Sequence, residues 1–210
     1  MTELVVITAV ALVAWFAAGT IWNVSWGRAL MRWMQDGLPT FGERTTVRWL
    51  GSSAVEMVIR EGKAPFASVT LIIFLEPRDT PWTWAFGRAR GRRDMLIVRG
   101  MLRRAPRVEF EALDVGSWSD REALGRVPKE WSASQPASSD NLVVHYSSAA
   151  ALECANALLT EARHAGLVVK RLSVRPTEPH FQIHIRPPDQ RQPARDFFKV
   201  VRAIAERALA

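Results

Sequence analysis

The stretch that decides the fold is Leu4–Trp22, LVVITAVALVAWFAAGTIW, which contains no charged side chain. The nearest charged residues are Glu3 before it and Arg28 after it. A helix needs about 20 mostly apolar residues to cross a hydrocarbon core of roughly 30 Å. A helix also satisfies its own backbone hydrogen bonds in lipid. The stretch therefore predicts a transmembrane helix.

A cleaved signal peptide is the alternative interpretation of the same stretch. Signal peptides start with a positively charged segment and end at a small-residue cleavage site. The first three residues, MTE, contain no Lys or Arg, and the apolar sequence continues past the small residues 17–19 to Ile21 and Trp22. These features favour a retained anchor.

Basic residues follow the apolar stretch, whereas none precedes it: the first four are Arg28, Arg32, Arg44 and Arg48. Lys and Arg within about 15–20 residues of a span remain on the cytoplasmic side. We therefore expect a single-pass membrane protein with a short N-terminus outside and a cytoplasmic C-terminal domain.

The helix is expected to continue beyond the bilayer as an interfacial amphipathic segment, so that residues 1–37 form one unit with a bend at Gly27. At 100° per residue, three tryptophans and Ala29 share one stripe and the arginines lie elsewhere. Tryptophan favours the headgroup level. An alternative is that the stripe packs on a partner helix or on the protein's own domain. The expected membrane-interface residues are Trp22, Trp26, Arg28, Arg32 and Trp33.

The charge of the chain is concentrated in one place. There are 28 Lys and Arg against 21 Asp and Glu, a formal net charge of +7. The stretch from Arg78 to Arg107 holds nine Arg against Asp79 and Asp94, which accounts for the whole surplus. Nucleic-acid proteins usually carry a basic face across the domain. A single patch on an anchored protein suits an anionic lipid surface at least as well.

Alternating apolar residues predict strands through most of 41–132, a β-rich subdomain. Residues 95–104 and 108–113 are expected to form a hairpin in which Leu102 opposes Phe110, because a three-residue loop gives the best cross-strand matching. Residues 133–140, ASQPASSD, predict a linker. A second subdomain, 141–210, then shows a β-α-β-β-α pattern. The expected fold class is α+β: a single N-terminal transmembrane helix, a mixed, mainly antiparallel β-rich region, and this C-terminal unit.

An aromatic and basic insertion interrupts the β-rich subdomain at residues 77–94, PRDTPWTWAFGRARGRRD. Thr80 before Pro81 predicts the start of a short helix. Rings beside guanidinium groups suit a membrane interface, single-stranded nucleic acid, or a solvated loop packed on the sheet. The expected lipid-or-partner patch comprises Trp82, Trp84, Phe86, Arg88, Arg90, Arg92 and Arg93.

A second candidate is a polar sheet face in the C-terminal subdomain. On the strand predicted at 180–186, Phe181, Ile183 and Ile185 alternate with polar residues. A solvated face is the ordinary interpretation, and an anion-binding or acidic-partner platform is the functional one. The candidate residues are Arg171, Arg175, His180, His184 and Arg186.

The sequence offers little for catalysis. His180 and His184 are about 13 Å apart in a strand, too far to share a metal ion. Cys154 is the single cysteine, which excludes an intramolecular disulfide and a multi-cysteine metal site. No GxSxG, HExxH or P-loop spacing occurs. We expect no cofactor, no metal site and no catalytic residue.

The functional hypothesis is a non-enzymatic membrane-anchored scaffold or accessory subunit, with anionic lipid headgroups and proteins of a larger membrane complex as partners. The alternatives are a membrane-tethered module for nucleic acid or another anionic ligand, with nucleic acid less favoured, and an enzyme whose catalytic residues are dispersed in the sequence.

Overall fold

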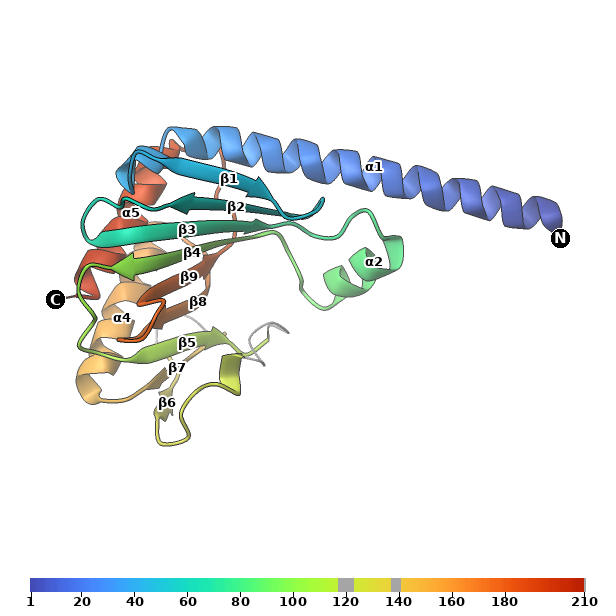
Figure 1. The fold of residues 1–210 in the computed structure, drawn as a ribbon. Coiled ribbons are helices and arrows are strands. Elements are labelled where there is room, and N and C mark those ends of the chain that lie inside the picture. Colours follow the sequence, from blue (N-terminus) through green and yellow to red (C-terminus); the bar gives the residue numbers. More distant parts are fainter. Residues whose placement is uncertain (117–122, 137–140, 210) are drawn as a thin grey trace.

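The structure is a computed structural model that describes residues 1–116, 123–136 and 141–209 (Figure 1). The helical elements are α1 (Thr2–Gln35), the 3₁₀ helix η1 (Leu38–Thr40), α2 (Pro81–Ala89), α4 (Ala149–His164) and α5 (Ala194–Arg207). The strands are β1 (Thr45–Trp49), β2 (Ala54–Ile59), β3 (Phe66–Phe74), β4 (Met95–Leu102), β5 (Phe110–Asp114), β6 (Ser132–Ser134), β7 (Leu142–Tyr146), β8 (Val169–Val174) and β9 (Phe181–Ile185). The α+β class is confirmed.

One nine-stranded antiparallel sheet forms the centre of the protein, in the order β1-β2-β3-β4-β9-β8-β5-β7-β6. The regions 41–132 and 141–210 both contribute strands to it. β4 lies beside β9, and β5 lies between β8 and β7. The predicted linker 133–140 begins within β6, and its last four residues lie outside the described part of the chain.

The hairpin predicted between β4 and β5 is wrong. Leu102 opposes Phe66 of β3, whereas Phe110 opposes Tyr146 of β7 and Val174 of β8. Every residue of β5 is buried, and most of β4 is buried too. Buried strands need a neighbouring strand on each edge, because their backbone N–H and C=O groups cannot reach water. The C-terminal strands supply those partners by inserting between β4 and β5.

Helix α1 is continuous through Gly27, so the predicted bend does not occur. A Cβ at this position would lie 2.8 Å from Cη2 of Trp49. The absent side chain therefore makes room for the Trp49 ring beneath an unbroken helix. Residues 1–18 are exposed, and a buried stripe follows at intervals of three or four residues. It comprises Gly19, Asn23, Gly27, Leu30 and Met34.

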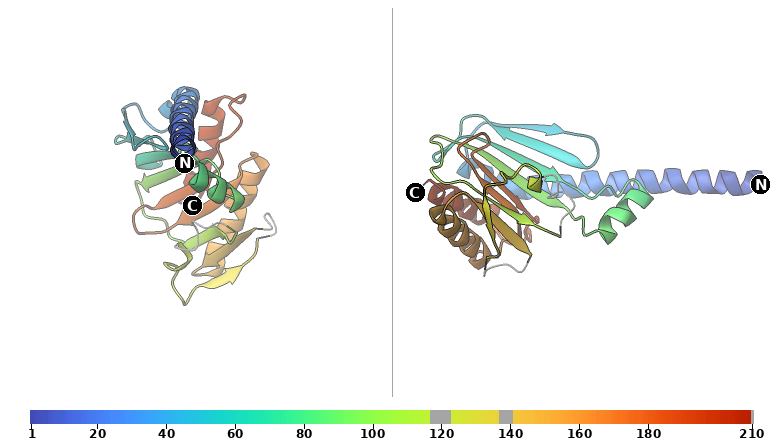
Figure 2. Two further views of the ribbon diagram at one scale, coloured as in Figure 1. Left: turned by 90° about the vertical axis from the view of Figure 1, so that its right-hand side faces the viewer. Right: turned by 90° about the horizontal axis from the view of Figure 1, so that it is seen from below.

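The second half of α1 is part of the domain core. Together with α4 and α5 it covers one face of the sheet (Figure 2). Leu30 and Met34 are fully buried, and the Trp33 indole donates a 2.7 Å hydrogen bond to the Gln192 carbonyl. The Trp33 ring also packs on Phe197 of α5. A fragment starting after α1 would therefore expose part of the core.

Local sequence signals account for several of these elements. Of two adjacent serines that could cap α4, Ser148 does so by accepting a hydrogen bond from the Ala151 N–H. The short helix predicted after Thr80 is α2. The last helix, α5, buries Phe197, Val201 and Ile204, which the helical period of about 3.6 residues places on one face.

Replacing Leu30 or Met34 by Ala should lower the free energy of unfolding of the domain by about 2–5 kcal/mol, because each change leaves a cavity in the core. Denaturant unfolding of the full chain in detergent, followed by near-ultraviolet circular dichroism, would measure this. The control is Leu12→Ala, since Leu12 is 42% exposed. Equal effects at positions 12 and 30 would contradict the assignment of the second half of α1 to the core.

Candidate membrane-interface site

The segment that enters α2 is fixed to α1 by a buried amide. The Asn23 side chain is completely buried in the middle of the α1 stripe. Its amide nitrogen donates to the Glu76 carbonyl at 3.0 Å, and its oxygen accepts from Nη1 of Arg78 at 3.1 Å. Both hydrogen-bonding ends of a buried polar group are thus satisfied, as burial requires.

A bidentate ion pair joins the two ends of the insertion. Arg78, in the loop after β3, donates from Nη1 and Nη2 to the two carboxylate oxygens of Asp94, at 3.1 and 2.9 Å. Asp94 precedes β4 and also accepts the Glu76 N–H at 2.7 Å. The bidentate geometry holds the two ends of the insertion together, so α2 is presented on a closed loop.

Close packing places this loop directly against α1. A Cβ at Gly19 would lie only 2.3 Å from the Arg78 carbonyl oxygen, so the approach needs glycine. The same oxygen accepts a 2.9 Å hydrogen bond from the Trp15 indole. Residues 15, 19 and 23 of α1 thus form a contact stripe for the start of the insertion. We call this set of contacts, with Arg78 and Asp94, the α1 clamp.

Trp84, the second tryptophan of α2, holds this helix against α1. The Trp84 ring lies 6.1 Å from the Trp15 ring, centroid to centroid. Its indole donates at 2.8 Å to the buried Glu76 carboxylate, which also accepts from Arg88 at 3.2 Å. Within the predicted patch, Trp84 therefore faces α1 rather than solvent.

The remaining members of the patch face outward. Trp82 is 62% exposed and Phe86 is 58% exposed. The Arg90 guanidinium lies 3.8 Å from the centre of the Phe86 ring, and the Arg93 side chain donates to the Arg88 carbonyl. Arg92 is exposed, as are Arg88 and Arg90. The loop thus presents two exposed rings, one of them stacked with Arg90, beside exposed guanidinium groups.

More exposed apolar side chains lie at the same end of the molecule. Trp22 and Ile21 project from α1, with 65% and 66% of their surface exposed. Leu50 follows β1 and Phe74 ends β3, at the sheet end from which α1 and α2 extend (Figure 1). This end therefore combines apolar side chains from three separate parts of the chain.

The residues predicted to lie at the membrane interface fall into an exposed group and a partly buried group. Trp22 is exposed, whereas Trp26 and Trp33 are partly buried against the domain core. Arg28 and Arg32 are exposed and line a groove between α1 and β1. Trp26 and Trp33 therefore follow the alternative interpretation, in which the tryptophans pack on the protein's own domain.

The predicted polar face of β8 and β9 has the expected alternation but is not solvated throughout. Phe181, Ile183 and Ile185 are fully buried on the helix side. On the other side, His184 and Gln182 are only 7% exposed, so the expectation of a solvent-exposed face does not hold for them. The Gln182 amide hydrogen-bonds to Nε2 of His184.

Sequence reasoning missed the carboxylate at the centre of this face. Glu111 of β5 is fully buried and accepts hydrogen bonds from Arg171, Ser173 and Arg175. The register of β5 against β8 places it there, opposite Ser173. Of the other predicted members, His180 contacts the Leu102 backbone and Arg186 is exposed. Two of the arginines thus neutralise a buried charge.

The chain matches no protein-family model and no curated protein sequence. Among the described residues, α1 is the one helix long and apolar enough to span a membrane, a test that a signal sequence also passes. No group of three His, Cys, Asp or Glu side chains in the described ranges could hold a metal ion.

The buried imidazole predicts a pH dependence. Burial, together with the nearby Arg171 and Arg99 charges, lowers the pKa of His184 from 6.5 to about 3. Between these pH values the unfolded chain binds a proton that the folded chain does not. Stability should therefore fall on acidification below pH 6.5, by up to about 1.4 kcal/mol per pH unit from this group.

Denaturant unfolding at several pH values, compared between the native chain and His184→Gln, would measure this contribution. The variant should lose that part of the slope, and the His184 ring signal in NMR should not titrate near pH 6.5. An imidazole that titrates normally would contradict the burial.

Proposed function

We propose that this protein is a non-enzymatic, single-pass membrane-anchored scaffold or accessory subunit whose domain contacts the bilayer a second time through α2. The observation that supports this proposal is the α1 clamp. It holds α2 alongside the apolar helix, at the level where that helix would leave the hydrocarbon.

The depth of α2 follows from the rise of a helix, about 1.5 Å per residue. The exposed part of α1, residues 1–18, is about 27 Å long. It is therefore close to the roughly 30 Å of a hydrocarbon core. When residues 1–18 span the hydrocarbon core, Gly19 lies at the edge of the core and Trp15 lies about 6 Å inside that edge. Interfacial helices bury their apolar faces by about 5–10 Å, so α2 lies at the depth typical of them.

The side chains of α2 suit that position. Trp82 and Phe86 can insert at the boundary, where aromatic rings are favoured. Arg90 and Arg92 can meet lipid phosphates, at about 1 kcal/mol for each basic residue near an anionic surface. Arg88 is already paired with Glu76 and contributes less. Trp22 lies on α1 about 4–5 Å beyond Gly19, on the headgroup side of the core edge, where tryptophan is also favoured.

The clamp also favours this proposal over the alternatives. Removal of a signal sequence near residues 17–19 would delete Trp15, with its hydrogen bond to Arg78 and its contact with Trp84. Nucleic acid would have to reach α2 at the depth of the lipid headgroups. In orientation, we propose that the N-terminus lies outside and the domain is cytoplasmic, because Arg28, Arg32, Arg44 and Arg48 follow the span.

Immersion of α2 can be measured on the full chain in nanodiscs that contain anionic lipid. A Cys154→Ser background would carry one spin label, at Trp82→Cys, Phe86→Cys or, as the control, Glu61→Cys at the far end of the sheet. Labels at 82 and 86 should be more accessible to oxygen than to a water-soluble nickel complex, and the label at 61 should show the reverse.

Two further variants separate the contributions to this immersion. Gly19→Leu should reduce it, because the added side chain displaces the insertion from α1. Replacing Arg88, Arg90, Arg92 and Arg93 by Gln should reduce it most in anionic lipid at low salt. Water-like accessibility at positions 82 and 86 in the native chain would refute the proposed contact. Binding of single-stranded nucleic acid through the same arginines would favour the alternative function.

Topology provides a separate prediction. A reporter enzyme that works only in the cytoplasm should be active when fused after Ala210, and one that works only outside the cytoplasm should be inactive there. A cysteine at the same position should resist membrane-impermeant reagents until the cells are opened. A cysteine placed before Glu3 should react in intact cells. Labelling of the C-terminus from outside would reverse the proposed orientation.

A further inference from the structure

Strand β1 has a free edge. Among the residues that the structure describes, it pairs with β2 alone and is the first strand of the sheet. The Leu50 N–H donates to the Ala54 carbonyl at 2.9 Å, which makes these two a hydrogen-bonded pair. Such pairs alternate along an antiparallel ladder. The backbone groups of Thr45, Val47 and Trp49 therefore point away from β2.

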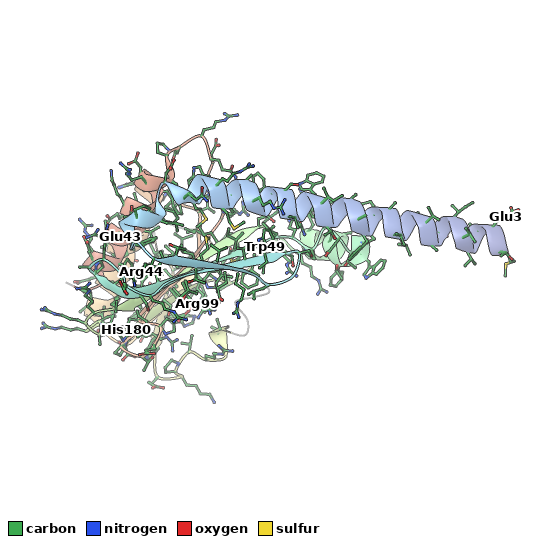
Figure 3. The ribbon with its side chains drawn as sticks, turned by 45° about the horizontal axis from the view of Figure 1, so that its top comes forward. Glu3, Glu43, Arg44, Trp49, Arg99 and His180 are labelled. Atoms are coloured by element: carbon green, nitrogen blue, oxygen red, sulfur yellow. The ribbon has the colours of Figure 1, made fainter. Side chains whose placement is uncertain are left out.

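This edge has few of the features by which proteins usually protect a free strand. β1 contains no Pro or Lys, its one charged residue, Arg48, is paired with Glu56 of β2, and its pairing with β2 runs through five residues without a bulge. Val47, at its centre, is 50% exposed. Figure 3 shows Arg44 and Trp49 at the two ends of the strand, with α1 running alongside. An exposed, regular edge of this kind can accept another strand.

A groove of about 510 Å³ lies between β1 and α1. Met31, Leu38, Val47 and Met57 supply apolar lining. Side chains alternate along a strand, so a strand added beyond β1 would direct every second side chain towards this groove. The edge and the groove therefore form one continuous surface for an extended peptide.

The charge at the groove indicates which peptide would bind. Arg28 and Arg32 line it, and none of the described residues that line it is acidic. Neither arginine forms an ion pair with another residue in the described part of the chain. A second copy of this chain pairing through β1 would bring the same arginines together, and like charges oppose that arrangement. An acidic partner neutralises them.

The position of the groove along α1 favours a protein over a lipid. Arg28 is nine residues beyond Gly19 and Gln35 is sixteen beyond, about 14–24 Å along the helix axis. The groove is thus separated from the apolar end of the molecule formed by Trp22, Trp82 and Phe86. Its occupant would come from the aqueous side.

We propose that the edge of β1 binds an extended acidic segment of a partner protein as an additional strand. Backbone hydrogen bonds to Thr45, Val47 and Trp49 hold the segment. Acidic side chains on its groove-facing side pair with Arg28 and Arg32, and an apolar side chain between them packs on Val47. The docking surface is separate from α2 and does not depend on the proposed membrane contact.

The test uses the full chain in detergent micelles and a synthetic heptapeptide, acetyl-TETVTET-amide, whose Glu, Val and Glu share one face when extended. The peptide should bind, and it should slow amide hydrogen exchange at Val47 and its outward-facing neighbours. A peptide with Lys in place of Glu should bind at least tenfold more weakly. Absence of binding, equal binding of the two peptides, or binding without protection of β1 would overturn the proposal.

Matched variants locate the site. Val47→Pro removes an outward N–H without removing a β1–β2 hydrogen bond, and should weaken binding at least tenfold. Val47→Thr keeps the N–H and loses only part of the apolar contact, so it should bind more weakly than the native chain but clearly more tightly than Val47→Pro. Arg28→Gln with Arg32→Gln should also weaken binding about tenfold. If Val47→Pro fails to fold, the exchange measurement on the native chain decides.

Two controls separate this surface from the other possibilities. Replacing Arg88, Arg90, Arg92 and Arg93 by Gln should leave peptide binding unchanged, and a loss there would refute the β1 site. Conversely, Val47→Pro should leave α2 immersion unchanged, so each proposal can fail alone. If the native chain is a dimer that Val47→Pro converts to a monomer, a second copy occupies the edge and the proposal is wrong.

Discussion

The buried side chain of Asn23 is the constraint on which the arrangement of this molecule depends. A polar amide in a stripe of Gly, Leu and Met would be costly to bury without hydrogen bonds. Its partners are the Glu76 carbonyl and Arg78, which lie in the loop after β3. Satisfying one helix residue therefore fixes where the sheet ends and where α2 begins. The Arg78–Asp94 pair then closes the insertion on the same point.

The two halves of helix α1 differ in their surroundings. Its first 18 residues contact little of the protein, whereas its second half supplies Leu30 and Met34 to the core. Because one rigid helix carries both parts, the domain has little freedom to tilt relative to the apolar segment. A tether with a flexible linker would leave α2 free to leave the bilayer. The rigid connection is what gives α2 a defined depth in the proposed function.

The two proposed contact surfaces differ in chemistry because they lie in different surroundings. α2 offers exposed rings and guanidinium groups, which suit a boundary between hydrocarbon and phosphate. β1 offers backbone hydrogen-bonding groups and a basic groove, which suit an extended chain in water. A third polar region, around Glu111, is closed by its own ion pairs and supports the sheet from within. In the proposed function, the two contact surfaces together would let this protein hold a partner segment at a fixed height above a membrane.

The sequence by itself determined the features that depend on neighbouring residues: the apolar helix, the α2 start at Thr80–Pro81, a serine cap for α4 at position 147 or 148, and the strand alternation around Ile183. These follow from periodicity and capping, which act within a few residues. It could also identify the aromatic and basic character of residues 82–93, but not that Trp84 turns inward to Glu76. Only the tertiary structure decided the strand order, the burial of His184 and Glu111, and the attachment of α2 to α1. Each of these joins residues dozens of positions apart, such as Asn23 with Arg78 or Glu111 with Arg171. Local pattern cannot specify such pairs, because many registers bury the same apolar residues and long-range contacts select among them.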